Sequence, residues 1–138
     1  MEEQDFKIIS DYGNVSKVIQ EIREYLTEKG LEEHLCNAVE ICLTEALNNV
    51  IKHSYLGDNS KTIDIKIHKN ANTLEMKIID TGRPRQNLTV KELDFDPEDI
   101  ENLPESGMGL FIIKQLMDEM DYYTSDGKNY FILKKWLF

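Results

Sequence analysis

Two neighbouring segments of the chain alternate between apolar and polar residues, as strands with one buried face do. Ile63, Ile65 and Ile67 alternate with polar residues over positions 61–68, and the same pattern leads from Leu74 to Asp80. The polar stretch between them predicts a turn, so we expect a hairpin. Three further strands are predicted over residues 6–10, 122–125 and 130–137, with the last two joined by a turn at Asp126 and Gly127.

Three other segments carry apolar residues at helical spacing. The first is predicted to run over residues 15–29, with Asn14 as its cap and Gly30 as the residue that ends it. The second is predicted over residues 32–53 and the third over residues 109–120. Their buried stripes are predicted to include Val15, Val18, Ile22, Tyr25, Leu26, Leu35, Val39, Cys42, Leu43, Ala46 and Val50.

The order of these elements predicts one domain spanning residues 1–138. Strands and helices do not alternate strictly, so we expect an α/β fold of the two-layer α+β sandwich type. Its helices would pack on one face of a mixed, mostly antiparallel sheet. Residues 83–106 hold three prolines and many acidic residues, and a connection of this length in a compact domain is typically a functional loop or lid.

Charge and composition narrow the possible functions. The chain has 16 Lys plus Arg against 26 Asp plus Glu, a net charge of −10, which argues against general nucleic-acid binding. It has no apolar run long enough to span a membrane and no apolar leader segment, so we expect a cytoplasmic protein. Cys36 and Cys42 lie too far apart on one helix for a disulfide and match no common metal pattern, so we expect two buried thiols.

The second predicted helix carries polar residues beside its buried stripe. Glu45 and Asn49 are four residues apart and share a face, which Lys52 and His53 continue. A carboxylate there can orient or deprotonate a hydroxyl, and an amide oxygen can ligate Mg²⁺. From spacing alone, a solvated helix face, with His53 near the negative end of the helix dipole, is the simpler explanation.

Two short glycine motifs are further candidates. Asp80-Thr-Gly82 follows a strand and is either a simple turn or an Asp that accepts a hydrogen bond from a base amine. Ser106-Gly-Met-Gly-Leu110 opens a helix, where free amide groups suit phosphate, but short glycine patterns of this kind also serve as flexible helix entries.

Taken together and in this order, the motifs resemble those of the GHKL ATPases. Glu45-Ala-Leu-Asn-Asn49-Val-Ile-Lys-His53 resembles the N box, Asp80-Thr-Gly82 the G1 box, and residues 106–120 the G2 box with its helix. The last run is most similar to the bacterial anti-sigma factor serine/threonine kinases, which phosphorylate STAS-type anti-anti-sigma proteins.

The resemblance implies a Bergerat fold and a role for each residue. Glu45 would be the catalytic carboxylate, and Asn49 would hold Mg²⁺. Asp80, with Gly82 beside it, would bind the adenine amino group of ATP. The remaining nucleotide contacts would come from His53, Gly107, Met108, Gly109 and Leu110. Partners would be a sigma factor and a STAS-domain protein, and related proteins form homodimers.

Two positions depart from the family pattern. Pro84 stands where the G1 box commonly has a second Gly, which predicts a stiffer start to the lid. Lys128-Asn129-Tyr130 offers no Thr near the base, where the family often has one. Three functions remain open: a kinase of this kind, a binding module that regulates a partner without phosphorylating it, and a regulatory ATPase without a protein acceptor.

Overall fold

The computed structural model describes residues 2–85 and 105–137. Its elements are the strands β1 (Glu2–Ile9), β2 (Thr62–Lys69), β3 (Thr73–Asp80), β4 (Glu119–Ser125) and β5 (Lys128–Trp136), the α-helices α1 (Tyr12–Glu28), α2 (Glu33–Asn49) and α3 (Glu105–Leu116), and the short π-helix η1 (Val50–Ser54). The predicted lid, residues 83–106, lies mostly outside the described residues.

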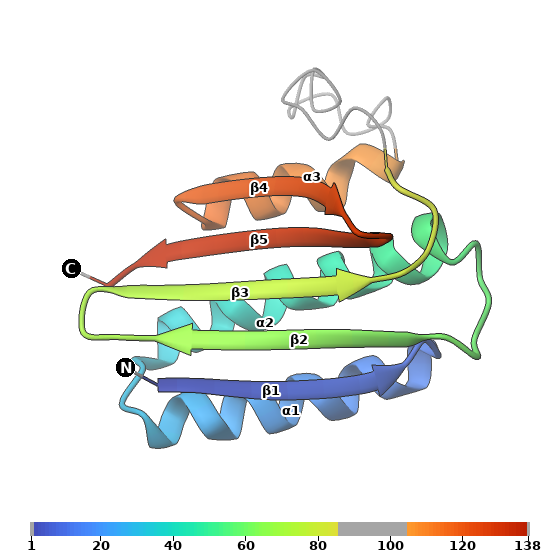
Figure 1. Ribbon diagram of the computed structural model, residues 1–138. Coiled ribbons are helices and arrows are strands. Elements are labelled where there is room, and N and C mark those ends of the chain that lie inside the picture. The colour runs from blue at the N-terminus through green and yellow to red at the C-terminus, as the bar shows by residue number, and fades with distance from the viewer. Residues whose placement is uncertain (1, 86–104, 138) are drawn as a thin grey trace.

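The strands form one sheet in the order β1-β2-β3-β5-β4, and the helices lie behind one face of it (Figure 1). Each described strand pair is antiparallel. The predicted two-layer fold is therefore confirmed, although the sheet described here is wholly antiparallel and not mixed. None of the helices in the described residues is long and apolar enough to cross a membrane.

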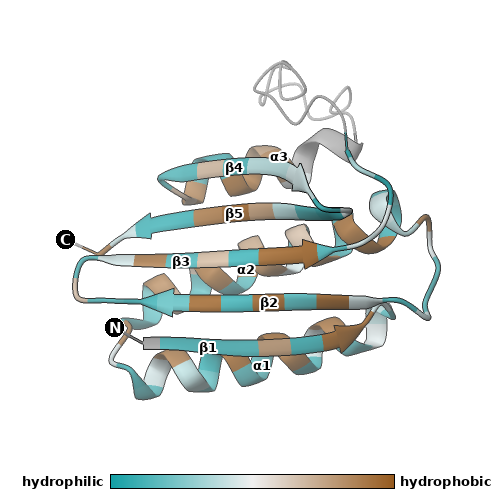
Figure 2. Cartoon of the chain, in the orientation of Figure 1, coloured by the Kyte–Doolittle hydropathy of each residue, from teal (hydrophilic) through white to brown (hydrophobic). Residues whose placement is uncertain are grey.

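The core lies between the sheet and the helices. Along β2 and β3 the buried residues alternate with half-exposed ones, which gives the banded pattern of Figure 2. Ile63, Ile65 and Ile67 are fully buried, as are Leu74 and Met76. Each Å² of apolar surface removed from water contributes about 25 cal/mol to the free energy of unfolding. The buried face of the sheet is therefore the main source of stability. Cys36 and Cys42 belong to this core as free thiols, as expected.

The first helix begins earlier than the sequence predicts. Asp11 is its N-cap, with a side chain that accepts a 2.8 Å hydrogen bond from the amide of Gly13. The choice of Asn14 as the cap was wrong: Asn14 lies inside α1, and its side-chain amide donates to the carbonyl of Ile9. Gly30 ends the helix with a φ of 86°, as predicted.

The second helix changes its geometry near its end. The sequence predicts one continuous helix to His53, whereas α2 ends at Asn49 and five residues follow as the π-helix η1. The wider turn is closed by a bond from the amide of Tyr55 to the carbonyl of Val50. Such turns occur frequently at functional sites, and this one directs the carbonyl of Ser54 toward the end of β3.

The bounds predicted for the third helix were also wrong. The helix begins at Glu105 and ends at Leu116, and Met120 belongs to β4. Asp118 explains the early end, because its amide donates to the carbonyl of Lys134 and its carboxylate accepts from the amide of Trp136. Pairing with β5 therefore replaces helical hydrogen bonds from this residue onward.

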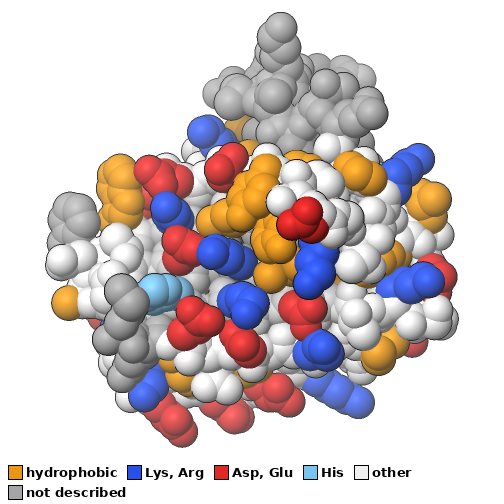
Figure 3. Space-filling model, viewed as in Figure 1, with side chains coloured by type: hydrophobic (Ala, Val, Ile, Leu, Met, Phe, Trp, Pro, Cys, Tyr) orange, Lys and Arg blue, Asp and Glu red, His pale blue; other side chains and the backbone are white. Residues whose placement is uncertain are grey.

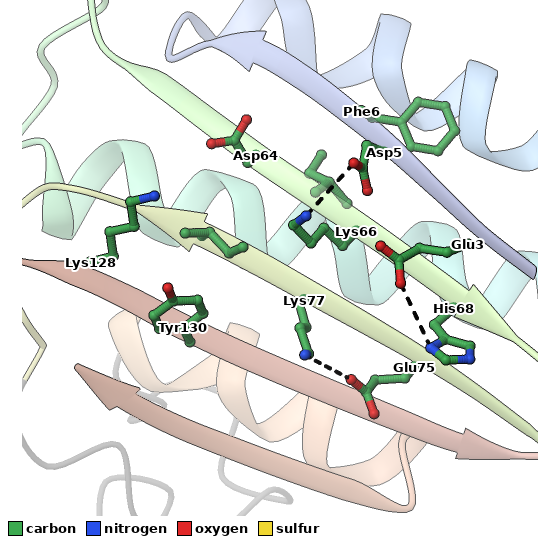
Figure 4. A pocket seen from close by; sticks show the side chains of 12 residues that line it. Glu3, Asp5, Phe6, Asp64, Lys66, His68, Glu75, Lys77, Lys128 and Tyr130 are labelled. Atoms are coloured by element: carbon green, nitrogen blue, oxygen red, sulfur yellow. Dashed lines mark ion pairs between the residues drawn. The ribbon is translucent and has the colours of Figure 1, made fainter. Parts of the chain in front are cut away.

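The open face of the sheet carries acidic and basic side chains side by side (Figure 3). A hollow on this face is crossed by ion pairs that join neighbouring strands (Figure 4). Lys66 Nζ lies 3.7 Å from Asp5 Oδ2, and His68 Nδ1 lies 4.0 Å from Glu3 Oε2. Because these charges compensate one another at the surface, the hollow is a solvated ionic face and is distinct from the predicted site.

Candidate functional site

The turn after β3 holds the carboxylate that the sequence singles out. Asp80 is the last residue of β3 and is 2% exposed. Its Oδ1 accepts a 2.9 Å hydrogen bond from the amide of Gly82, which closes the turn. Burial raises the pKa of Asp80, while hydrogen bonds from Asn129, Gly82 and Ser54 act in the opposite direction.

Gly82 is required by the close approach of η1. A Cβ at this position would lie 2.4 Å from the carbonyl oxygen of Ser54 and 2.8 Å from the ring of Tyr55. The next residue, Arg83, donates its amide to the same Ser54 carbonyl at 2.8 Å. The hydroxyl of Tyr55 also accepts from the amide of Thr81 at 2.9 Å. The π-helix therefore fixes the turn in place, and no larger side chain fits between the two segments.

Two polar residues from the last hairpin complete this end of the sheet. Asn129, 1% exposed, donates from Nδ2 to Asp80 Oδ1 at 2.8 Å and to the carbonyl of Gly82 at 3.0 Å. Thr124 donates its hydroxyl to Asn129 Oδ1 at 2.8 Å. Residues 128–130 lack the Thr that the resemblance leads one to expect, and neither Asn129 nor Thr124 was predicted as a site residue. The available signal in β5 was the polar Asn129 on the face where the next two alternate positions, Phe131 and Leu133, are apolar.

The N-box residues meet the start of α3. A Cβ at Gly109 would lie 2.6 Å from Glu45 Oε2 and 3.5 Å from Asn49 Nδ2, so the backbone of α3 lies directly against both side chains. Glu45 and Asn49 are half-buried, as expected for the rim of a cleft. Nδ2 of Asn49 is buried and has no hydrogen-bond partner among the described residues, so it is available to a ligand.

A locally basic pocket of about 490 Å³ opens next to the Asp80 turn. It is lined by His53, Arg83, Pro84 and Arg85. Burial lowers the pKa of His53, and the charges of Arg85, Lys52 and Arg83 lower it further. Nε2 of His53 is buried without a hydrogen-bond partner in the described part of the chain. Although the chain is acidic overall, this pocket would attract an anion.

The remaining predicted nucleotide-binding residues lie in α3 and do not line this pocket. Gly107 and Met108 fall in the first turn of the helix, and Leu110 is 1% exposed within the core. A ligand could reach Leu110 only through its backbone. Lys52 is exposed. The amide of Arg85 donates to the hydroxyl of Tyr122 at 2.8 Å, which ties the beginning of the predicted lid to β4.

This geometry defines a class of protein: a two-layer domain with an acidic turn, a polar helix face and a helix N-terminus gathered at one end of its sheet. The sequence pattern of the histidine kinase-like ATPase domain matches residues 8–135. The chain therefore belongs to the histidine kinase-like (GHKL) ATPase family, whose members bind ATP.

Curated relatives include serine-protein kinases named RsbW. The chain is 30% identical to RsbW of Listeria innocua over 93 residues, which cover 64% of this chain and 59% of that protein. It is 31% identical to RsbW of Bacillus cereus over 99 residues, 70% of this chain and 61% of that one. The chain thus spans about three fifths of the length of these relatives.

Solved structures share the fold at lower sequence identity. The RsbU and RsbW domains of Rv1364c from Mycobacterium tuberculosis match with a TM-score of 0.69 at 16% identity, covering 98% of this chain and 32% of that one. The SiaB-SiaC complex from Pseudomonas aeruginosa matches with a TM-score of 0.63 at 14% identity, covering 97% and 89%. The catalytic domain of the histidine kinase ThkA gives 0.56 at 16% identity, covering 98% and 95%. These likenesses confirm the Bergerat fold.

Proposed function

We propose that this chain is a serine/threonine protein kinase that uses ATP and Mg²⁺ to phosphorylate a serine of a STAS-domain anti-anti-sigma protein, and that it sequesters a sigma factor. The observation that carries the proposal is the contact of Gly109 with Glu45 and Asn49. It brings the G2 and N boxes together in a chain whose curated relatives are serine-protein kinases.

The adenine base and the phosphates would each meet a complementary group. The buried carboxylate of Asp80, with Gly82 beside it, would accept a hydrogen bond from the adenine amino group. The free amides in the first turn of α3, which includes Gly107, would face the phosphates from the positive end of the helix. The buried nitrogens of Asn49 and His53 that lack partners among the described residues would gain them from the same groups.

A magnesium ion fits this donor set. The side-chain oxygen of Asn49 is a hard ligand of the kind that Mg²⁺ accepts, together with waters and phosphate oxygens. Bound there, the ion would neutralise the charge of the phosphates. Among the described residues no cluster of three or more His, Cys, Asp or Glu could hold a metal ion. Asn49 would be the protein ligand, and nucleotide and water would occupy the other positions.

Glu45 would act on the incoming hydroxyl. Its half-buried carboxylate would orient the serine and take its proton as the serine oxygen forms a bond to the γ-phosphorus. The bond between that phosphorus and the oxygen of ADP breaks in the same displacement. Positioning and electrostatic stabilisation would supply most of the acceleration, as they do in phosphoryl transfer generally.

The test combines a pull-down with phosphosite mapping. The chain is incubated with a STAS-domain partner with ATP, with ADP or without nucleotide, and the partner is analysed by mass spectrometry. We expect a phosphoserine that falls about a hundredfold or more in Glu45→Gln, while ATP affinity changes little. Glu33→Gln, on the exposed first turn of the same helix, is the matched control. A partner that binds in the presence of ATP but acquires no phosphoserine would contradict kinase activity.

That outcome would leave the second function, a module that regulates a partner through ATP-dependent binding alone. Release of inorganic phosphate without any protein acceptor would instead indicate a regulatory ATPase. These alternatives share the nucleotide site with the kinase. Asp80→Asn and Asn49→Ala should therefore abolish ATP affinity under every one of them, and calorimetric titration of both variants checks the site independently of the reaction.

A further inference from the structure

Three polar side chains lie side by side across the last three strands of the sheet. Asp80 of β3 faces Asn129 of β5, and Asn129 faces Thr124 of β4 in the strand register. Phe131 and Leu133 are buried at the next inward positions of β5. Burying an amide among apolar neighbours costs free energy unless all its hydrogen-bonding groups are satisfied, so the partners of Asn129 indicate why it is there.

The side-chain amide of Asn129 has only one favourable orientation. Its Nδ2 donates both to Asp80 Oδ1, at 2.8 Å, and to the carbonyl of Gly82, at 3.0 Å. Its Oδ1 accepts from the hydroxyl of Thr124 at 2.8 Å. Turning the amide over would place its oxygen against a carboxylate and a carbonyl, which can only accept. The contacts therefore use both donors of the amide and fix its orientation.

This arrangement determines what Asp80 can offer a ligand. Oδ1 accepts from Asn129 and from the amide of Gly82, so its acceptor positions are filled. Neither group contacts Oδ2, and Ser54 is the third group that favours the ionised carboxylate, so Oδ2 is the oxygen that a base amine would meet. Burial raises the pKa of Asp80, and the donor group of Asn129 is the largest of the contributions that lower it. Asn129 thus opposes protonation of the carboxylate that the nucleotide would meet.

We propose that Asn129 is a positioning residue for base recognition, which keeps Asp80 an oriented acceptor and so selects a purine with a 6-amino group over one with a 6-keto group. The inference rests on the proposed ATP site. An ionised carboxylate accepts from the amino group of adenine but repels the keto oxygen of hypoxanthine. A protonated carboxyl group can donate to that oxygen, so the selection depends on the charge of Asp80.

The groups around Asp80 do not supply a competing acid at neutral pH. Tyr122 of β4 is the titratable neighbour on the sheet, and burial raises the pKa of its phenol, so it stays neutral. Further charged or titratable side chains near this turn are Tyr55, whose hydroxyl accepts from the amide of Thr81, and His53, Arg83 and Arg85. A change in pH dependence caused by an Asn129 variant would therefore report on Asp80.

The experiment compares ATP with inosine triphosphate, which differs from it only in carrying oxygen at position 6 and hydrogen on N1. Both are titrated calorimetrically into wild-type protein, Asn129→Asp and Thr124→Val, from neutral pH down to the lowest pH at which the protein stays folded. Asn72→Asp, in the exposed turn between β2 and β3, is the matched control. Thermal melts check that each variant is folded.

We expect wild-type protein to prefer ATP and to lose ATP affinity as the pH falls through the raised pKa of Asp80. In Asn129→Asp the two carboxylates compete for one proton. ATP affinity at neutral pH should fall about tenfold or more, the preference over inosine triphosphate should fall about as much, and the pH midpoint should move upward. Thr124→Val should shift all three in the same direction, with about a two- to fivefold loss of affinity.

The outcomes separate this inference from the function on which it rests. Unchanged base preference and an unchanged pH midpoint in folded Asn129→Asp and Thr124→Val would overturn the role of Asn129 and leave the ATP site standing. If Asn129→Asp does not fold, Thr124→Val decides alone. Failure of the wild-type protein to bind ATP would overturn the nucleotide site itself, and the inference with it.

Discussion

Replacing Gly109 by Ala should slow phosphoryl transfer while leaving the stability of the fold nearly unchanged. The added methyl group would lie 2.6 Å from Glu45 Oε2, and an ordinary contact begins at 3.4 Å. The carboxylate must therefore withdraw by about 0.8 Å. The obstacle is the far end of a flexible side chain, and a turn of that side chain away from its preferred rotamer costs about 0.5–1.5 kcal/mol. Ala gains about 0.5–1 kcal/mol over Gly within a helix.

These terms nearly cancel, so the free energy of unfolding should stay within about 1 kcal/mol of wild type. The reaction should respond differently, because a displacement of about 1 Å in a reacting group can cost on the order of a hundredfold in rate. We expect phosphoserine formation to fall about ten- to a hundredfold, while ATP affinity falls much less. Single-turnover transfer from radiolabelled ATP and urea denaturation measure the two effects.

Gly13→Ala is the matched control, because its Cβ would also approach a carboxylate, Asp11 Oδ1, but only to 3.3 Å. It lies in the first turn of α1, which carries none of the site residues. Transfer at the wild-type rate by a folded Gly109→Ala variant would refute the contact between α3 and Glu45 as the basis of the reaction.

Other substitutions and labels probe the same arrangement. Gly82→Ala places a methyl group against the backbone of Ser54, so the free energy of unfolding, measured by urea denaturation, should fall by about 1–3 kcal/mol. Tyr55→Phe leaves the amide of Thr81 without its acceptor and should cost about 1–3 kcal/mol, visible as a lower melting temperature. Burial raises the pKa of Cys42 to about 12, so iodoacetamide at pH 8 should label this thiol only after unfolding, as mass spectrometry would show.

The pattern of apolar residues was enough to predict the layers of this fold. Ile63, Ile65 and Ile67 specify a strand because the sheet has one buried face, and each of them is fully buried. Element ends were harder to predict. Asp11 caps α1 in place of Asn14, and pairing through Asp118 starts β4 before the helical pattern ends, because hydrogen bonds to distant residues decide these boundaries.

The residues of the candidate site differ in how clearly the sequence points to them. Glu45, Asn49 and Asp80 stand in recognisable motifs, and the structure places them at the same end of the molecule. Asn129 and Thr124 stand in no motif and lie 49 and 44 positions beyond Asp80. Only the strand register reveals that they hold it. The π-helix was missed as well, since its residues continue the helical pattern of the sequence.

The turn at Asp126 and Gly127 constrains the last hairpin in length as well as in shape. Both residues have positive φ, at 53° and 76°, as a two-residue hairpin turn requires. Side chains alternate along a strand, so an insertion or deletion of one residue that shifted β5 would bring Lys128 or Tyr130 opposite Asp80 and turn Asn129 to the open face. Variants of this protein can therefore tolerate other residues in the turn. A change in the length of the turn is tolerated only if the register that places Asn129 beside Asp80 is kept.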